Sequence, residues 1–439
     1  TLGDSGDTFT IPAGVTITNS GTAAGFGATG AASWDTTVKT TGFTAVSGVG
    51  YFVNTTAGII TVTLPASPSA GDVVAVSDYA GTSDTYAITI GRNGSNINGA
   101  AADLNIQIEN SAVTLVYVDS TQGWKATDTA SLNDIELQPT YVTATGGTIT
   151  TSGDYKIHTF TGPGTFCVSN AGNPLGSIAV DYLVVAGGGS GANANCGSNG
   201  QAGGAGAGGF RESSGTASGS YSASPLGACV SALPVSVQGY SIVVGGGGAA
   251  LPADGQGNNG NLSTFSTITS TGGGGGGRAG PTAGSGGSGG GAACGFTAGA
   301  GNTPPVSPPQ GNTGGIAAGS NPAGTMVSGG GGGATAVGGV GTASTGPAGP
   351  GGAGATTSIS ASPTAYAGGG GGGGNNGQPG GGSGGSGGGG AGGAYPLGPG
   401  TNGTTNTGGG GGASASGPGS ATSGAGGSGI VIIRYKFQN

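Results

Sequence analysis

The sequence predicts an all-β chain combined with polyglycine II: N-terminal strands, a β-sandwich or roll, and a domain of packed polyglycine helices closed by a small sheet. Two observations predict this fold class. Apolar and hydroxyl residues alternate in short segments of the first third, as is typical of strands. Glycine is concentrated in the rest: 24 of the 113 glycines lie in residues 1–185 and 89 lie in residues 186–439.

Residues 1–32 form the first expected part. Apolar and β-branched hydroxyl residues alternate over 8–11 and 15–18, and Pro12 and Gly14 turn the chain between the two segments. Two strands this short cannot bury a core by themselves. We therefore expect residues 1–32 to serve oligomerisation or attachment by pairing with other chains or with a preceding segment.

Residues 33–130 are expected to form a compact β-sandwich or roll. Short strands separated by turn residues at spacings of about ten residues are typical of such folds, and no helical period of useful length interrupts them. Trp124 closes this part, and residues 131–145 are expected to be a polar linker. The strand candidates are residues 50–53, 59–64, 72–76, 86–90 and 111–118.

Residues 146–439 hold the glycine runs. Without a Cβ, glycine adopts the extended threefold helix of the polyproline II type, which has no internal hydrogen bonds. Neighbouring runs can supply those bonds because no side chain holds them apart. Ordering glycine is entropically costly, so we expect the runs to form one cooperative block. Residues 182–185, 242–244 and 430–435 are expected to join one small sheet at its base.

Charge excludes several classes of protein. The net charge is −8, only eight Lys and Arg residues are present, and no Asp or Glu follows Asp254. Such a chain is unsuited to neutralise nucleic-acid phosphates. No apolar run approaches the roughly 20 residues that span a bilayer, so membrane insertion is not expected.

No enzymatic chemistry is legible, and neither a cofactor nor a metal site is expected. The single histidine, His158, lies in a strand-like segment and favours a structural role over that of a catalytic base. The Gly-x-Gly patterns lack the helix and acidic residue of a dinucleotide site, and no phosphate-binding loop is present. Asp78 and Asp84 fit a solvated loop, and Arg211 and Glu212 are expected in an exposed turn.

The four cysteines leave alternatives open. They allow three pairings, and none shows a metal-binding spacing. They are either isolated small apolar side chains or two disulfides formed in an oxidising compartment. The cysteines are Cys167, Cys196, Cys229 and Cys294.

Several phrases in a fixed order resemble bacteriophage tail-fibre proteins. Residues 50–72, 90–97 and 114–124 are similar to a β module repeated in such fibres. The stretch from Gly153 to Tyr435 resembles the glycine-rich C-terminal domain of phage fibres and adhesins, including the tip adhesins of T-even-type phages. The resemblance implies a non-enzymatic virion protein, extracellular on a tail or capsid fibre, that is a homotrimer and contacts other virion proteins.

Receptor binding is expected in the turns between glycine runs, because these turns hold nearly all bulky side chains of the last half. A rigid scaffold that displays variable loops commonly uses them for recognition. The expected partner is a host cell-surface receptor, either an outer-membrane protein or a glycan. The candidate residues are Phe296, Pro304, Pro305, Val306, Pro308, Pro309, Met326, Tyr395, Pro396 and Leu397.

Two other classes stay open at this point. One is a virion fibre or decoration protein without a dedicated receptor. The other is a secreted cellular protein, either a surface component or an ice-binding glycine-rich protein. Ice binding predicts flat, regularly spaced Thr or Gly faces, whereas the turns here are irregular and bulky.

Overall fold

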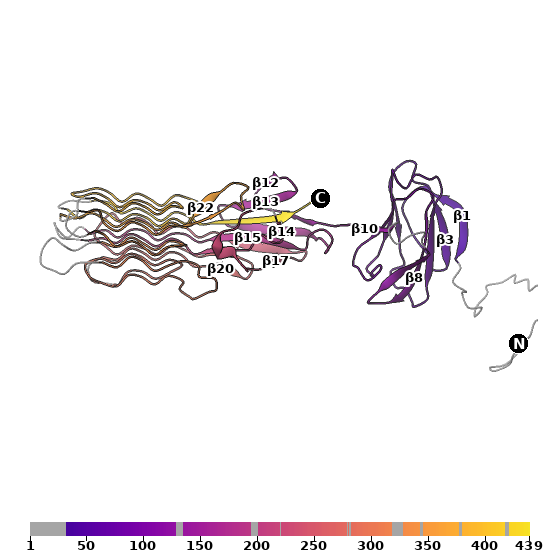
Figure 1. Ribbon diagram of the computed structural model, residues 1–439, viewed down its shortest axis with the longest axis horizontal. Helices are drawn as coiled ribbons and strands as arrows, with labels where there is room; N and C mark the ends of the chain where they lie inside the picture. Colours follow the sequence, from indigo (N-terminus) through magenta and orange to yellow (C-terminus); the bar gives the residue numbers. More distant parts are fainter. Residues whose placement is uncertain are drawn as a thin grey trace, which may run out of the picture. The chain divides into compact units, whose positions relative to one another are not determined.

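The computed structural model divides the chain into two compact units, Thr1–Gln138 and Pro139–Asn439. The fold is all-β with several sheets and a glycine-rich C-terminal domain, which confirms the predicted fold class (Figure 1). The predicted N-terminal part lies outside the described residues except for Ala32. The structure describes residues 32–128, 135–194, 201–219, 221–278, 280, 282–317, 328–342, 346–376, 380–417 and 421–439.

Unit 1 is a sandwich of two five-stranded sheets, ordered β1-β3-β5-β8-β9 and β10-β7-β6-β4-β2. The five predicted strands are present as β3, β4, β5, β6 and β8. The strands are β1 Ser33–Lys39, β2 Phe43–Thr44, β3 Val49–Val53, β4 Ile60–Thr63, β5 Val73–Asp78, β6 Ile88–Gly91, β7 Leu104–Ile106, β8 Ala112–Asp119, β9 Gly123–Asp128 and β10 Ile135–Leu137.

The first six strands of unit 1 alternate between the two sheets. Within each sheet these strands pair in parallel: β1 pairs with β3 and β3 with β5 in one sheet, and β2 with β4 and β4 with β6 in the other. The later strands pair antiparallel. One core of alternating inward side chains fills the space between the sheets, and Trp124 is fully buried in it.

The linker predicted over residues 131–145 is wrong in part. β10 pairs with β7 and so belongs to the unit 1 sandwich. β11, Val142–Thr145, pairs with β14 and belongs to unit 2. The division between the units falls at Gln138 and Pro139. Both strands are short, with three and four residues, so their sequence resembled a linker.

Unit 2 combines a second sandwich with the glycine runs. Its sheets are ordered β11-β14-β18-β19-β20 and β12-β13-β23-β15-β16, with β17 on β15 and a separate hairpin of β21 and β22. The remaining strands are β12 Thr148–Ser152, β13 Tyr155–Phe160, β14 Gly164–Ala171, β15 Ala179–Val185, β16 Phe210–Glu212, β17 Leu233–Pro234, β18 Gly239–Val243, β19 Ser263–Phe265, β20 Ile268–Ser270, β21 Ala355–Thr357, β22 Thr364–Tyr366 and β23 Ile430–Lys436.

The expectation of one small sheet at the base of the glycine block is wrong. β15 and β23 pair with each other, as expected, but β18 lies in the opposite sheet. The sheet that contains β15 and β23 is buried on both faces, so it needs a facing sheet, and β18 belongs to that facing sheet. One face packs on β14 and β18 across the sandwich, and the other packs on Ala334, Ile359 and Tyr366.

The glycine runs follow a threefold helix. Along residues 187–193, every third backbone amide donates to the same neighbouring run, so three neighbours are served in rotation. This period of three is that of the polyproline II helix. Gly187, Ser190 and Asn193 donate to Asn261, Asn258 and Gly255; Gly188 and Gly191 donate to Gly427 and Gly424; Gly189 and Ala192 donate to Gly206 and Gly203.

The run 202–209 lies at the centre of the bundle. Its amides donate to three neighbouring runs and its carbonyls accept from three others, so it has six hydrogen-bonded neighbours. All of its residues are buried. The runs lie side by side in Figure 1, as these hydrogen bonds require. The six neighbours are residues 187–193, 271–277, 286–292, 329–333, 368–374 and 408–412.

Candidate functional site

The bundle has two ends that differ in what they display. At the sheet end, the runs continue into strands, as Gly209 does into β16 and Gly429 into β23. At the opposite end, here called the far end, the runs are joined by turns. Ala194 and Gln201 lie at this end, where the Ala194 amide donates to Ser414 Oγ and Gln201 Oε1 accepts from the Cys294 amide.

Phe296 lies at the far end and is 42% exposed. It follows the run 286–292 in a turn in which its amide donates to the carbonyl of Ala293. The neighbouring Cys294 amide donates to Oε1 of Gln201, at 3.0 Å. The side chain is therefore displayed from a turn that is bonded to Gln201, at the start of a neighbouring run.

The Tyr395–Leu397 turn lies at the same end. The carbonyl of Gly398 accepts from the amide of Ala415, in the run whose Ser414 amide bonds to Ala192. Leu397 is 44% exposed, and Tyr395 is half-buried. The run that leads into this turn contains Gly390, and the run that leads to Phe296 is 286–292. Two runs, 202–209 and 368–374, lie between them.

Two further far-end side chains were missed by sequence reasoning. Ile316 and Val340 are 60% and 43% exposed and stand at the far ends of their runs. Each is a single aliphatic residue in a glycine-rich stretch, without the Tyr or Pro that marked the other turns. The far-end surface is defined here as Phe296, Ile316, Val340, Tyr395 and Leu397.

The proline loop does not join this surface, so the ten predicted receptor residues do not form one site. Thr303 donates from its amide to Gly286, and Gln310 bonds through its Oε1 to the amide of Thr271 beside β20, which places the loop at the sheet end. Asn302 fixes the loop by bonding both the amide and the carbonyl of Val306. Pro304, Pro305 and Pro309 are exposed, Val306 and Pro308 are half-buried, and Met326 lies outside the described residues.

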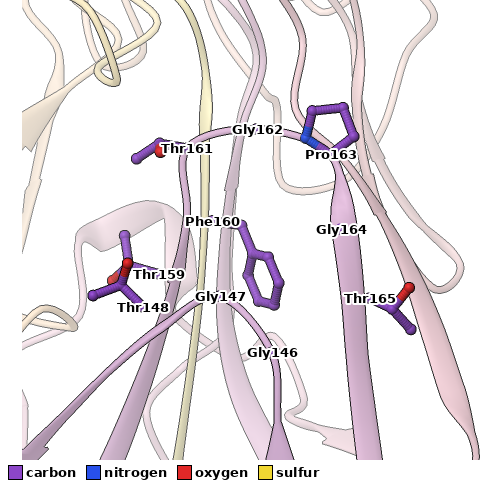
Figure 2. Close-up of a pocket in the computed structure, with 10 residues that line it drawn as sticks. All are labelled: Gly146, Gly147, Thr148, Thr159, Phe160, Thr161, Gly162, Pro163, Gly164 and Thr165. Atoms are coloured by element: carbon purple, nitrogen blue, oxygen red, sulfur yellow. The ribbon is translucent and has the colours of Figure 1, made fainter.

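A shallow depression of about 350 Å³ opens between the turn at Gly146 and Gly147, which precedes β12, and the turn that joins β13 to β14 (Figure 2). Its lining is neutral, and includes the hydroxyls of Thr148, Thr159 and Thr161. Phe160 packs beneath it and is only 4% exposed. The depression brings together no acid, base or nucleophile pair that could perform a reaction.

A buried polar cluster stabilises one face of the second sandwich. Asp181 is fully buried and accepts from Ser213 Oγ, Gly215 N and Ser218 N and Oγ, at 2.6–3.2 Å. Its register partner on β23 is Arg434, whose guanidinium lies over Tyr155 and Tyr221, at 4.8 and 5.4 Å. These bonds hold residues 213–218 against the sheet.

The expectation that Arg211 and Glu212 form an exposed turn is wrong. Both lie on β16, and Glu212 is 2% exposed. Its carboxylate accepts from the amide of Ser224 and from the hydroxyl of Thr357 on β21. Burial raises the pKa of Glu212 above its ordinary value, against the opposing effect of these bonds. The residue joins three chain segments and is structural.

His158 is fully buried and structural. Nδ1 lies 2.7 Å from the carbonyl of Gly146, which can only accept, so Nδ1 carries the proton. Nε2 therefore accepts from the hydroxyl of Tyr435, at 3.0 Å, and that oxygen accepts from the amide of Ala144. Burial lowers the pKa of His158, while the bond to Gly146 opposes the shift.

The lowered pKa of His158 predicts a pH dependence of stability. Below the unfolded value of 6.5, the unfolded chain binds a proton that the folded chain does not. The free energy of unfolding of unit 2 should therefore fall as the pH drops below 6.5, by at most about 1.4 kcal/mol per pH unit. Calorimetry of wild type and His158→Gln between pH 7.5 and 5.5 checks this.

The comparison with His158→Gln is needed because Glu212 acts in the opposite direction. Because the pKa of Glu212 is raised, the folded chain keeps a proton on this residue above pH 4.5, where the unfolded chain has lost it. The contribution of Glu212 to stability therefore falls as the pH rises. Both proteins share that effect, and their difference isolates His158. A difference in stability that stays constant over this range would contradict the prediction.

The described residues contain neither a cluster of metal-ligating side chains nor a helix that could cross a membrane. They contain no group of three His, Cys, Asp or Glu residues placed to hold a metal ion. No helix in the described part of the chain has the length and hydropathy to cross a membrane. Cys167 and Cys229 are exposed free thiols, and Cys294 is half-buried. Cys196 lies outside the described residues. Two disulfides would need all four cysteines, so the predicted alternative of two disulfides is wrong.

The fold defines an all-β protein whose larger unit is built on hydrogen-bonded glycine runs. The family model described as a glycine-rich domain matches residues 161–436. The chain belongs to this glycine-rich domain family. No curated protein matches the chain.

Proposed function

We propose that this chain is a phage tail-fibre or adhesin protein that attaches to the host cell surface through the far-end surface. One observation carries the proposal. The bundle is made of runs with almost no side chains, yet its far-end turns display Phe296, Ile316, Val340 and Leu397, each more than 40% exposed. Large apolar side chains are costly to leave in water unless a partner covers them.

The scaffold supports this role. Each run is bonded to its neighbours along its length, so the turns are held in fixed positions. A partner that binds them does not have to order the scaffold, which lowers the entropic cost of association. The virion location, the homotrimeric state and contacts with other virion proteins remain part of this proposal, and they rest on the resemblance to phage fibres.

Adsorption of the fluorescently labelled protein to a panel of intact bacterial strains tests the proposal. The variant Phe296→Ser/Tyr395→Ser/Leu397→Ser should lose most of its adsorption to any strain that the wild type binds. The matched control, Pro305→Ser/Pro309→Ser, changes exposed residues at the sheet end and should adsorb like the wild type. Calorimetry should show that both variants keep the wild-type unfolding transitions.

The other outcomes contradict the proposal in different ways. Loss of adsorption only in the proline variant would move the receptor site to the sheet end. Equal adsorption by all three proteins would exclude both loops. If the wild type bound no strain in the panel, a fibre or decoration protein without a dedicated receptor would be favoured.

A further inference from the structure

We propose that unit 1 carries a binding site for neutral oligosaccharides at one end of its sandwich. The site is formed by the loops 54–59, 79–87 and 107–111. It is separate from the far-end surface of unit 2 and goes beyond the proposed function. It is built on exposed aromatic and aliphatic side chains, on the bonds that fix the loops, and on the acidic residues around them.

The exposed side chains are the first observation. Tyr79 and Tyr86 are 57% and 42% exposed, and Ile59 and Ile108 are 67% and 43% exposed. Tyr86 precedes Ile88 by two residues and Ile108 follows Ile106 by two, and Ile88 and Ile106 are register partners. Tyr86 and Ile108 therefore lie just beyond the paired ends of β6 and β7.

The two ends of the described part of unit 1 lie away from the three loops, and the connection from β9 to β10 falls outside the described residues. β1 begins at Ser33, which bonds to Gly48, at the end from which β3 sets out. β10 ends at Leu137, opposite Leu104, and Gln138 bonds to Asp103. β3, β5 and β7 all run from that end toward the three loops. The described chain therefore enters and leaves unit 1 at the end opposite the tyrosines.

The loops are fixed by a buried carboxylate. Asp78 is 6% exposed and accepts from the amides of Ala80, Gly81, Ser83 and Asn110, at 3.2–3.3 Å. It thus binds the loop 79–87 to the loop 107–111. The expectation of a solvated loop is therefore wrong for Asp78, which is buried and structural, whereas Asp84 is exposed.

Two further bonds complete the support. Ser83 is fully buried and its hydroxyl donates to the carbonyl of Ile108, at 2.6 Å. The hydroxyls of Thr55 and Thr82 lie 2.9 Å apart and join the loop 54–59 to the loop 79–87. The three loops therefore present their side chains in one arrangement before any partner arrives, and binding them does not require the backbone to be ordered.

The chemistry favours a neutral sugar. A sugar ring has a face of C–H groups that packs on the electron-rich face of an aromatic ring, and Tyr supplies such a face at low entropic cost. Asp84 and Glu109 are exposed in the same loops and can accept hydrogen bonds from sugar hydroxyls. The same carboxylates repel uronic acids and sialic acids. The site therefore fits neutral chains and disfavours acidic ones.

Isothermal titration of the full chain tests the site, with cellohexaose, maltohexaose and a hexamer of N-acetylglucosamine as neutral probes. At least one should bind saturably, and hexagalacturonate should bind at least tenfold more weakly than that probe. Tyr79→Ala/Tyr86→Ala should weaken the neutral binding about tenfold or more, because it removes both ring faces. The matched control is Val46→Ala, an exposed residue at the opposite end of unit 1, which should leave binding unchanged.

A second variant keeps the result interpretable. Asp84→Asn/Glu109→Gln should narrow the difference between cellohexaose and hexagalacturonate without affecting folding, since both side chains are exposed. Failure of every neutral probe to bind, or unchanged binding by the tyrosine variant, would overturn the proposal. The far-end variant of unit 2 should bind the probes like the wild type, so this site and the proposed receptor site can fail independently.

Discussion

Replacement of Gly204 by alanine should unfold the glycine bundle at a much lower temperature than in the wild type. A Cβ at Gly204 would lie 2.1 Å from the carbonyl oxygen of Gly370, which belongs to a neighbouring run and cannot rotate away. The run 202–209 must therefore move away from Gly370. The bond from Gly204 N to the Gly329 carbonyl and the bond from Gly291 N to the Gly204 carbonyl would then lengthen. Overpacking and lost bonds together should cost more than about 3 kcal/mol.

Gly246→Ala is the matched control for this substitution. Gly246 is exposed, and a Cβ there would meet only Nδ2 of Asn261, at 3.7 Å, which is ordinary contact. Alanine also reduces the freedom of the unfolded chain, so Gly246→Ala should be neutral or stabilising by up to about 1 kcal/mol. Scanning calorimetry and hydrogen exchange of the bundle amides measure both variants. Similar transition temperatures for the two would show that the bundle is not close-packed.

Asp181→Asn should have the second largest effect. The substitution keeps the shape of the side chain but places an amide NH₂ where carboxylate oxygens accept from Ser213, Gly215 and Ser218. It also removes one negative charge facing the buried guanidinium of Arg434. Unsatisfied buried donors and a weakened charge pair should together cost about 3 kcal/mol.

The measurement for Asp181→Asn is the unfolding transition of unit 2 by calorimetry, with hydrogen exchange at residues 213–218. Exchange there should accelerate even at temperatures where the bundle stays folded. Asp154→Asn makes the same chemical change in a half-exposed turn and should cost less than about 0.5 kcal/mol. Protection at 213–218 equal to that of the wild type would show that Asp181 does not hold this segment.

Much of the fold was predictable because its signals are local. Five strands of unit 1 were identified from alternating apolar residues, and β15 and β23 from their β-branched runs. The other five strands of unit 1, β1, β2, β7, β9 and β10, were missed; β2, β7 and β10 are only two or three residues long. The assignment of β18 to the sheet of β15 was wrong because a strand pattern shows that a strand exists but not which of two facing sheets it enters.

The candidate receptor residues show the same limit more clearly. Phe296, Tyr395 and the proline loop were grouped because all are bulky residues in turns. Whether a turn lies at the far end or at the sheet end depends on how many residues each run has and on which neighbour it bonds to. The candidate sugar site of unit 1 was also hidden, since Tyr79 and Tyr86 come from one loop and Ile108 from another, and only the bonds of Asp78 and Ser83 join these two loops.

The sequence by itself determined that this chain is β-structured in its first part and bundled as polyglycine in its last, because strand alternation and the lack of a Cβ act on each residue locally. Only the tertiary structure decided which turns share an end, which carboxylates are buried and which tyrosines lie free. Those properties depend on hydrogen bonds between residues far apart in the chain, such as Gly188 with Gly427, and no local pattern specifies them.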